Sequence, residues 1–216
     1  MNQDEKQLLE DLETAKRNLA AAASKYRAQM GREFFEPGPS ISQARVEHAK
    51  VFGDRSGCLG LVRKGGRAVE IGTWAGSFAK EIWRSCEPAE LHIIDIDFSR
   101  FDHAFFEPHL GKRVFLHQGR SDDLAATFND GFFDFVYVDG DHSHHAAKAD
   151  IERYLPKLAS DGIMGVNDYT HWCTALGMPF GVARALHECI EELSLEVVAM
   201  GLERYGNHDL FVRRMK

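Results

Sequence analysis

The sequence has no apolar run long enough to span a membrane, and it has no block rich in lysine or arginine. Its 33 acidic side chains outnumber the 26 basic ones, which gives a formal net charge of −7. A chain that follows a phosphate backbone carries a positive surface, so neither a nucleic acid nor a membrane is expected as a partner. The N-terminal residues are charged and lack the apolar core of a secretory signal, so we expect a cytoplasmic location.

Cysteine is also scarce, and its spacing excludes two classes of site. The four cysteines, at positions 58, 86, 173 and 189, contain no C-x-x-C pair. This scatter argues against a disulfide framework and against a zinc cluster, and it fits reduced, packed thiols.

What the sequence does contain is a regular alternation of strand and helix patterns after residue 68. A chain of 216 residues with 44% hydrophobic residues fits one α/β domain with an extra element. The alternation predicts a parallel sheet covered on both faces, closed by an antiparallel hairpin because the link at 203–208 is too short for a crossover helix. The predicted strands are 68–72, 91–95, 113–118, 132–139, 162–167, 195–200 and 209–213; the predicted helices are 76–85, 99–109, 121–128, 144–158 and 180–193.

A separate helix is predicted over residues 4–30, where apolar side chains recur on one face of a charged, alanine-rich segment. Gly31 and the sequence Glu36-Pro-Gly-Pro39 end this pattern. Two interpretations remain open: the helix covers the domain, or it pairs with another subunit in a homodimer. We therefore expect an N-terminal helical arm or lid at residues 1–60 and a cofactor-binding domain at residues 61–216.

The segment around residue 72 predicts a strand, a tight turn and a helix. Gly72 and Gly76 allow the backbone to turn and a ligand to approach closely, and the helix start offers unpaired N–H groups. Their spacing lacks the G-x-G-x-x-G pattern of pyrophosphate loops, which argues against the hypothesis of a nicotinamide cofactor. Glu70, inside the strand, needs a partner such as the cationic tail of a sulfonium cofactor. Asp95, at the end of the next strand, can accept both hydroxyls of a ribose.

The stretch Val69-Glu-Ile-Gly-Thr-Trp-Ala-Gly-Ser77 resembles motif I of class I S-adenosylmethionine-dependent methyltransferases, and Asp95 matches their motif II. The resemblance implies a Rossmann-like seven-stranded sheet of order 3-2-1-4-5-7-6 with an antiparallel last strand and helices on both faces. It also implies cofactor contacts from the motif residues and from the segment after the third strand: Glu70, Gly72, Thr73, Trp74, Gly76, Ser77, Asp95, Ser121 and Asp139. Ser121 has helix capping as an alternative role, and capping is the interpretation that we favour for it.

Polar residues also follow the fourth and fifth predicted strands. The carboxyl ends of neighbouring parallel strands meet at one edge of a sheet, so Asp139, Asn167 and Asp168 should converge there as oxygen ligands. Oxygen ligation suits Mg²⁺ or a similar divalent cation. Asp141 or His142 could remove a proton from the acceptor. His144 and His145 are expected at a solvated helix start.

The sequence Asp139-Gly-Asp-His-Ser143 resembles the D-G-D-H-S motif of methyltransferases that act on hydroxyls of small molecules. The leading hypothesis is therefore O-methylation of a small hydroxylated acceptor, assisted by a divalent metal. Three alternatives remain: a metal-independent methyltransferase of the same fold, a nicotinamide-dependent oxidoreductase, and a non-catalytic scaffold that retains the cofactor pocket.

Overall fold

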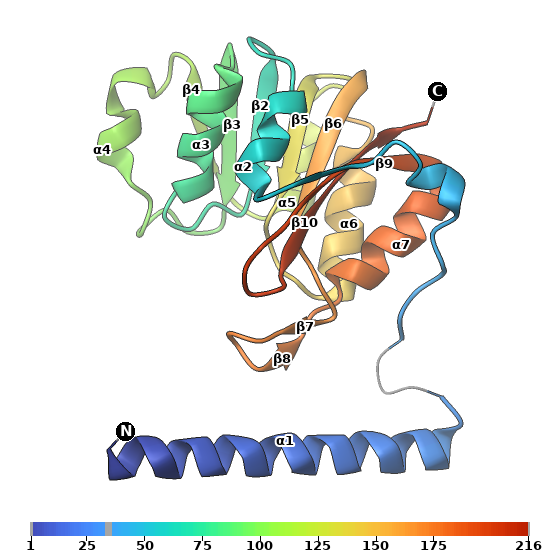
Figure 1. Cartoon of the computed structure of the whole chain (residues 1–216). Helices are drawn as coiled ribbons and strands as arrows, with labels where there is room; N and C mark the ends of the chain where they lie inside the picture. Colours follow the sequence, from blue (N-terminus) through green and yellow to red (C-terminus); the bar gives the residue numbers. More distant parts are fainter. Residues whose placement is uncertain (1, 33–35, 216) are drawn as a thin grey trace. The chain divides into compact units, whose positions relative to one another are not determined.

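The computed structural model describes residues 2–32 and 36–215 and divides the chain into two compact units, Met1–Pro37 and Gly38–Lys216 (Figure 1). The predicted arm, residues 1–60, ends later than the first unit, so residues 38–60 are part of the second unit. Residues 1 and 33–35 of the predicted arm lie outside the described residues.

The first unit contains one long helix, α1 (Gln3–Met30). Asn2 begins it, because the Asn2 side chain accepts a hydrogen bond of 2.7 Å from the backbone N–H of Glu5. Gly31 ends it in a left-handed conformation (φ +66°) and donates its N–H to the carbonyl of Arg27. None of the α1 residues is buried. In the part of the chain that the structure describes, every helix is too short or too polar to cross a membrane.

The second unit is built on an eight-stranded sheet of order β1-β9-β10-β6-β5-β2-β3-β4 (Figure 1). Strands β2, β3, β4, β5 and β6 run parallel, whereas β10 runs antiparallel to both of its neighbours. The long strands are β2 (Arg67–Ile71), β3 (Glu90–Asp95), β4 (Val114–Gln118), β5 (Phe133–Val138), β6 (Leu158–Tyr169), β9 (Leu195–Gly201) and β10 (His208–Arg214).

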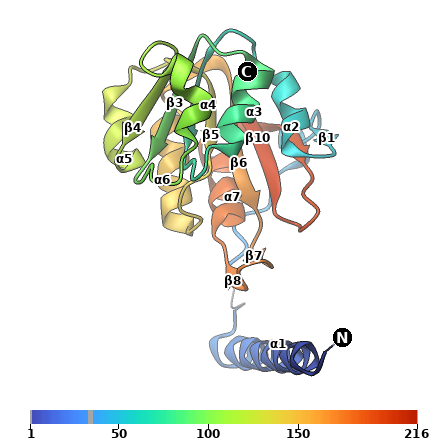
Figure 2. The same ribbon diagram turned by 90° about the vertical axis from the view of Figure 1, so that its left-hand side faces the viewer.

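Helices cover both faces of this sheet (Figures 1 and 2), and an apolar cluster lies on each side. One cluster packs Ile151 and Leu186, from α6 and α7, against the strands. The other packs Phe78 and Ile82, from α3. The middle strands are buried on both faces, which is why they read as continuous apolar runs in the sequence. The helices are α2 (Arg55–Cys58), α3 (Ser77–Cys86), α4 (His103–Phe106), α5 (Ser121–Leu124), α6 (His144–Tyr154) and α7 (Val182–Glu192).

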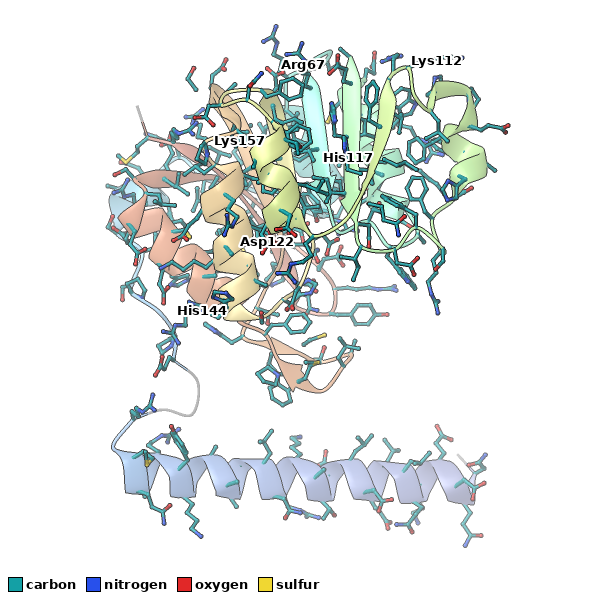
Figure 3. The ribbon with its side chains drawn as sticks, turned by 180° about the vertical axis from the view of Figure 1, so that it is seen from behind. Arg67, Lys112, His117, Asp122, His144 and Lys157 are labelled. Carbon is teal, nitrogen blue, oxygen red and sulfur yellow. The ribbon has the colours of Figure 1, made fainter. Side chains whose placement is uncertain are left out.

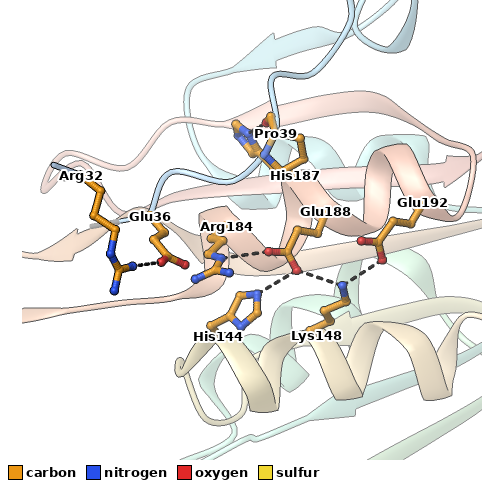
Figure 4. A network of polar contacts seen from close by, with 9 residues as sticks. All are labelled: Arg32, Glu36, Pro39, His144, Lys148, Arg184, His187, Glu188 and Glu192. Atoms are coloured by element: carbon orange, nitrogen blue, oxygen red, sulfur yellow. Dashed lines mark hydrogen bonds and ion pairs between the residues drawn. The ribbon is translucent and has the colours of Figure 1, made fainter. Parts of the chain in front are cut away.

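Ion pairs also join α6 and α7 on the outer surface (Figure 4). Lys148 Nζ lies 2.9 Å from Glu188 and 2.8 Å from Glu192. The Glu188 carboxylate also accepts from Arg184 and His144. This network fixes the start of α6, which follows directly after the predicted catalytic segment.

The prediction of seven strands is wrong in number. The short strand β1 (Lys50–Phe52) pairs in parallel with β9 and extends the sheet at that edge. Its three residues carry no alternating apolar pattern, so the sequence offered no signal for it. The other seven strands have the neighbours that the predicted order requires.

The predicted helices at 99–109 and 121–128 are also shorter than expected, because α4 and α5 each continue as a 3-10 turn. Pro108 lies in the turn after α4 and has no N–H to extend an α-helix. A further two-stranded hairpin, β7 (Trp172–Cys173) with β8 (Met178–Pro179), occupies the segment after β6 for which no element was predicted.

Candidate active site

The glycine turn after β2 has the close backbone packing that the sequence predicted. Gly72 is left-handed (φ +77°), and a Cβ at this position would lie 2.1 Å from the carbonyl oxygen of Asp139. Gly76 is also left-handed (φ +76°), and a Cβ there would lie 2.7 Å from the Phe101 ring. Only glycine combines this conformation with this lack of space. The turn therefore lies directly against the end of β5, where the predicted catalytic segment begins.

Asp95 holds the glycine turn in place. Its Oδ2 accepts the backbone N–H groups of Thr73 (2.8 Å) and Trp74 (3.0 Å), and its Oδ1 accepts that of Asp97 (3.1 Å). Trp74 adopts a left-handed conformation (φ +47°) that is costly for a bulky residue, and its side chain is 68% exposed. The carboxylate expected to bind a ribose thus also shapes the turn, and it lines the adjoining cavity.

Glu70 is a buried carboxyl at the floor of the same region. It is 1% exposed, and its Oε2 accepts a hydrogen bond from the Thr73 hydroxyl. Burial raises the pKa of Glu70 to about 8, against the opposing effects of the Thr73 hydrogen bond and the Arg55 charge. A cationic ligand group would favour the ionised form, so Glu70 fits the role of partner for an ammonium group.

These residues surround a cavity of about 770 Å³ at the carboxyl ends of β2, β3, β4 and β5. It has the size of small-molecule and cofactor sites. Of the predicted cofactor residues, eight line it: Glu70, Gly72, Thr73, Trp74, Ser77, Asp95, Ser121 and Asp139. Gly76 does not line the cavity; its place is in the turn against Phe101.

Several residues that were not predicted from the sequence also line the cavity. Arg55, from α2, donates to the Tyr137 hydroxyl at 3.0 Å and lies 3.8 Å from Asp139 Oδ2. Ile96 and Asp150 also line the cavity, as does His145, which the sequence placed at a solvated helix start. Arg55 and Tyr137 are 82 positions apart, so no local motif could have indicated their contact.

The Ser121 hydroxyl does not cap α5. The residue before α5, Arg120, makes no side-chain cap, and Ser121 Oγ instead donates to Asp150 Oδ1 at 2.6 Å. The nearby carboxylate of Asp122 (Figure 3) is held by Arg120 through two hydrogen bonds of 3.0 and 2.9 Å. The capping alternative for Ser121 is therefore wrong.

The predicted catalytic and metal-binding residues meet around one atom, Nε2 of His142. This nitrogen lies 3.2 Å from Asp168 Oδ2, 3.3 Å from Asn167 Oδ1 and 3.6 Å from Asp139 Oδ1. The ring stacks on Phe180 with centroids 4.5 Å apart. The sequence prediction that these strand-end residues converge is thus reproduced in the structure, with an imidazole at their centre.

Buried hydrogen bonds fix the orientation of this cluster. Asn167 Nδ2 donates to Asp209 Oδ1 (3.0 Å), so its Oδ1 faces His142, and Asp209 Oδ2 accepts from Tyr137 (2.5 Å). Asp209 is fully buried, and burial raises its pKa to about 6 against these two hydrogen bonds and the Arg55 charge. Sequence analysis missed Asp209, because it lies in the last strand, β10.

Two further electrostatic features mark this edge. Burial, with the negative charge of Glu70, raises the pKa of Asp139 well above its ordinary value. Asp168 has a left-handed backbone (φ +54°), and burial raises its pKa against the effect of His142. A non-glycine residue in this conformation costs about 1–3 kcal/mol, and such strain concentrates at functional sites.

Asp141, the other candidate for the base, lies outside this cluster. Its Oδ1 accepts the backbone N–H of Ser143 at 2.7 Å, next to the N-terminus of α6, and the side chain is exposed. His144 likewise faces away, with Nε2 2.9 Å from Glu188 (Figures 3 and 4). His142 is therefore better placed than Asp141 to act as a base.

The predicted magnesium site is not supported by the arrangement of the side chains. Asp139, Asn167 and Asp168 do direct oxygen atoms to one point, but the His142 nitrogen lies at that point. Among the described residues, no group of three or more His, Cys, Asp and Glu side chains is arranged to hold a metal ion. Carboxylate and amide oxygens are ligands of the type that a divalent cation prefers, but the His142 imidazole competes with a cation for the position between them.

Taken together, the doubly wound sheet, the glycine turn and the acidic residue at the end of β3 define a protein that binds a nucleoside-like cofactor at the carboxyl edge of its sheet. Comparison with known proteins defines the class further. Residues 69–169 match the family model described as a methyltransferase domain. The match includes the glycine turn, Asp95 and the residues around His142, which supports an S-adenosylmethionine-dependent methyltransferase.

Solved structures agree with this class at the level of the fold. A protein from Corynebacterium glutamicum is 17% identical with a TM-score of 0.57, over 97% of this chain and 98% of that chain. A Podospora anserina methyltransferase bound to S-adenosylhomocysteine is 18% identical with a TM-score of 0.53, over 69% and 72%. The tRNA methyltransferase TrmK of Bacillus subtilis is 13% identical with a TM-score of 0.56, over 76% and 67%. No curated protein matches the sequence.

Proposed function

We propose that the chain transfers the methyl group of S-adenosylmethionine to a hydroxyl of a small molecule, with His142 as the general base. The observation that carries this proposal is the position of the His142 ring between the carboxylates of Asp139 and Asp168, since Asp139 also lines the cofactor cavity. The D-G-D-H-S motif, which resembles that of small-molecule O-methyltransferases, supports the choice of acceptor.

The tautomer of His142 follows from its surroundings. Nε2 faces two carboxylates and one amide oxygen, so this nitrogen carries the proton and Nδ1 is the basic atom. Among the described residues, no hydrogen-bond donor occupies Nδ1. Asp139 and Asp168 then stabilise the imidazolium that forms when Nδ1 takes the proton of the acceptor hydroxyl.

The proposed reaction needs only two reactants, S-adenosylmethionine and the acceptor hydroxyl. When bound, S-adenosylmethionine supplies an activated methyl group and leaves as S-adenosylhomocysteine. The acceptor oxygen gains the methyl group and loses its proton to His142, which releases it to solvent. Glu70 would hold the ammonium group of the cofactor, and Asp95 would hold the ribose hydroxyls.

A divalent cation is the alternative to the His142 imidazole in this proposal. Asp139, Asn167 and Asp168 would hold it through their oxygens, and it would supply a Lewis acid that lowers the pKa of the acceptor hydroxyl. The position of the His142 nitrogen makes the cation and the imidazole competitors for one place. Removal of divalent metal therefore tests this part of the proposal separately.

A paired substitution tests the role of His142. His142→Ala should lower kcat roughly 10²- to 10⁴-fold, as expected for loss of a general base, while the affinity for S-adenosylhomocysteine is retained. His144→Ala is the matched control, because it removes a neighbouring imidazole whose partner is Glu188 on the outer surface. Acceptors are screened among hydroxylated small molecules by release of S-adenosylhomocysteine. Methylation of tRNA in preference to all of them would contradict the proposed acceptor class.

A further inference from the structure

Helix α1 carries an apolar face whose spacing is that of a coiled coil. The intervals between its apolar residues alternate between four and three over three heptads, at Leu8, Leu12, Ala15, Leu19, Ala22 and Tyr26. The leucines are 63%, 65% and 41% exposed. Such a contiguous stripe of exposed leucine is typical of an interaction surface.

The charges on α1 divide between its two halves. Residues 4–13 carry five carboxylates and one lysine, a net charge of −4. Residues 14–30 carry four basic side chains and no acidic one, a net charge of +4. A parallel pair of these helices would place like charges side by side, whereas an antiparallel pair places each acidic half against a basic half and also opposes the helix dipoles.

We propose that α1 forms an antiparallel two-helix coiled coil with α1 of a second copy of this chain. In this register the inner core layers each join a large and a small residue: Leu12 packs against Ala22 of the second copy, and Ala15 packs against Leu19. Pairing large with small keeps the distance between the helices constant over these inner layers. The layer at each end joins two larger residues, Leu8 and Tyr26.

The flanking positions fit the same register. Asp11 lies beside Lys25 of the second copy, and Asn18 lies beside its own counterpart at the centre. Lys16 also lies beside its counterpart, and this repulsion is reduced because Glu13 of the same helix is 3.3 Å from Lys16 Nζ. A parallel pair would bring Asp11 to Lys16, which is also attractive, so the direction is set by the opposite charges of the two halves of α1.

Sedimentation velocity of the full chain over a range of concentrations tests the proposal. The wild type should sediment as a dimer of its 24.3 kDa chain, and Leu19→Asp should raise the dissociation constant roughly tenfold or more. Asp11→Lys and Lys25→Glu should each weaken the dimer, and the two together should restore it. A wild type that stays monomeric at all concentrations would overturn the proposal, as would a double variant weaker than either single one.

Cysteine cross-linking tests the direction. Asn18→Cys should form a disulfide-linked dimer under oxidation, whereas Leu12→Cys should not, because Leu12 faces Ala22 of the second copy. The native cysteines, all buried and free, leave the wild type as the uncross-linked control. Cross-linking through Leu12→Cys but not Asn18→Cys would show a parallel pair and refute the antiparallel one.

A second, independent observation concerns Asp150 in the cofactor cavity. This side chain is 5% exposed, and its Oδ1 accepts from Ser121. In the described part of the chain, no donor reaches its Oδ2, although Asp150 lines the cavity. A Cβ on Gly140 would lie 3.2 Å from Oδ2, so the glycine leaves this oxygen accessible. The Asp150 carboxylate is thus buried, with a hydrogen-bond donor on one oxygen and the other oxygen accessible to a ligand.

The surroundings of Asp150 suit a flat base. Ile96 is 71% exposed although it lines the cavity, and Ala146 and Ala149 line it from α6. An aromatic ring between these apolar side chains would cover the exposed isoleucine. The other nearby carboxylate, Asp122, already holds Arg120.

We infer that Asp150 recognises the amino group of the cofactor adenine, an inference that depends on the cofactor being S-adenosylmethionine. An acceptor-only carboxylate distinguishes a 6-amino group, which donates, from a 6-oxo group, which accepts. The carboxylate comes from α6 and lines the cavity beside Ser121.

Calorimetric titration at pH 8 with S-adenosylhomocysteine and its deaminated analogue, S-inosylhomocysteine, tests this role. The wild type should prefer the adenine form, and Asp150→Asn should reduce that preference roughly tenfold, because an amide can donate to the 6-oxo group. Asp123→Asn is the control, because this neighbouring carboxylate is exposed and does not line the cavity, so its preference should remain. An unchanged preference in Asp150→Asn would refute the role of Asp150. A wild type that binds neither compound would refute the cofactor itself.

Discussion

Substituting Gly72 tests whether the glycine turn is required by its packing against Asp139 or only by its backbone conformation. Gly72 and Gly111 both have a left-handed backbone, with φ of +77° and +69°. An added methyl group at Gly72 would lie 2.1 Å from the carbonyl oxygen of Asp139 and 2.6 Å from its carbonyl carbon, whereas at Gly111 it would meet nothing within 4 Å. Gly111→Ala is therefore a control that isolates the conformational cost.

The left-handed conformation costs a residue other than glycine about 1–2 kcal/mol, which applies to both variants. At Gly72 the obstacle is backbone, so relief requires movement of the β5 end and strains the hydrogen bond of 2.8 Å from Asp139 N–H to Ile71. Overpacking of this kind adds about 1–3 kcal/mol. The expected loss is thus about 2–5 kcal/mol for Gly72→Ala against about 1–2 kcal/mol for Gly111→Ala. At this chain length each kcal/mol lowers Tm by about 2–4 °C.

Thermal unfolding and calorimetric titration with S-adenosylhomocysteine measure the two effects. Gly72→Ala should show the larger fall in Tm and should lose cofactor binding, because the turn and Asp139 both line the cavity. Gly111→Ala should bind as the wild type does. Equal losses of Tm in the two variants, or retained binding in Gly72→Ala, would refute the argument.

Three further predictions concern charge and metal. Burial raises the pKa of Glu70 to about 8, and a cofactor ammonium group would favour the ionised form. Binding of S-adenosylhomocysteine at pH 7 should therefore release a proton from Glu70. Titrations in buffers of different ionisation enthalpy should show this release, and Glu70→Gln should remove it. Burial lowers the pKa of His92 and of His117, whose ring nitrogens lie 2.9 Å apart. The unfolded chain therefore binds more protons than the folded chain below pH 6.5, and the free energy of unfolding should fall there. Urea unfolding at pH 7.5 and 5.5 should show a smaller fall in the double variant His92→Gln/His117→Gln than in the wild type. Treatment with EDTA should leave kcat unchanged, because the His142 imidazole occupies the centre of the oxygen cluster. A loss of turnover that added Mg²⁺ restores would show that a cation takes this place and would contradict the His142 base.

The parts of the molecule that the sequence predicts are those encoded by short-range patterns. The buried strands are continuous apolar runs, and the turn at Gly72 needs glycine for steric reasons, so both are visible locally. The convergence of Asp139, Asn167 and Asp168 follows from one rule about neighbouring parallel strands. By contrast, β1 has three residues with no periodic signal, and it is ordered by pairing with β9.

The missed site residues share one property: their partners are distant in the sequence. Arg55 reaches Tyr137 across 82 positions, Asn167 reaches Asp209 across 42, and Ser121 reaches Asp150 across 29. Each looks like an ordinary polar residue in its own segment. The packing of α2 and α6 on the sheet and the pairing of β10 with β6 bring these partners together, and a single sequence carries no record of those contacts.

The position of β10 has a consequence for how the enzyme matures. This strand, residues 208–214, inserts between β6 and β9, although both precede it along the chain. A ribosome-bound chain that has exposed only its first 200 residues has neither the central strand nor the Asp209 carboxylate that orients Asn167. The Asn167 amide can therefore be oriented only after β10 has joined the sheet, so the order of the cluster around His142 depends on one of the last segments to be synthesised.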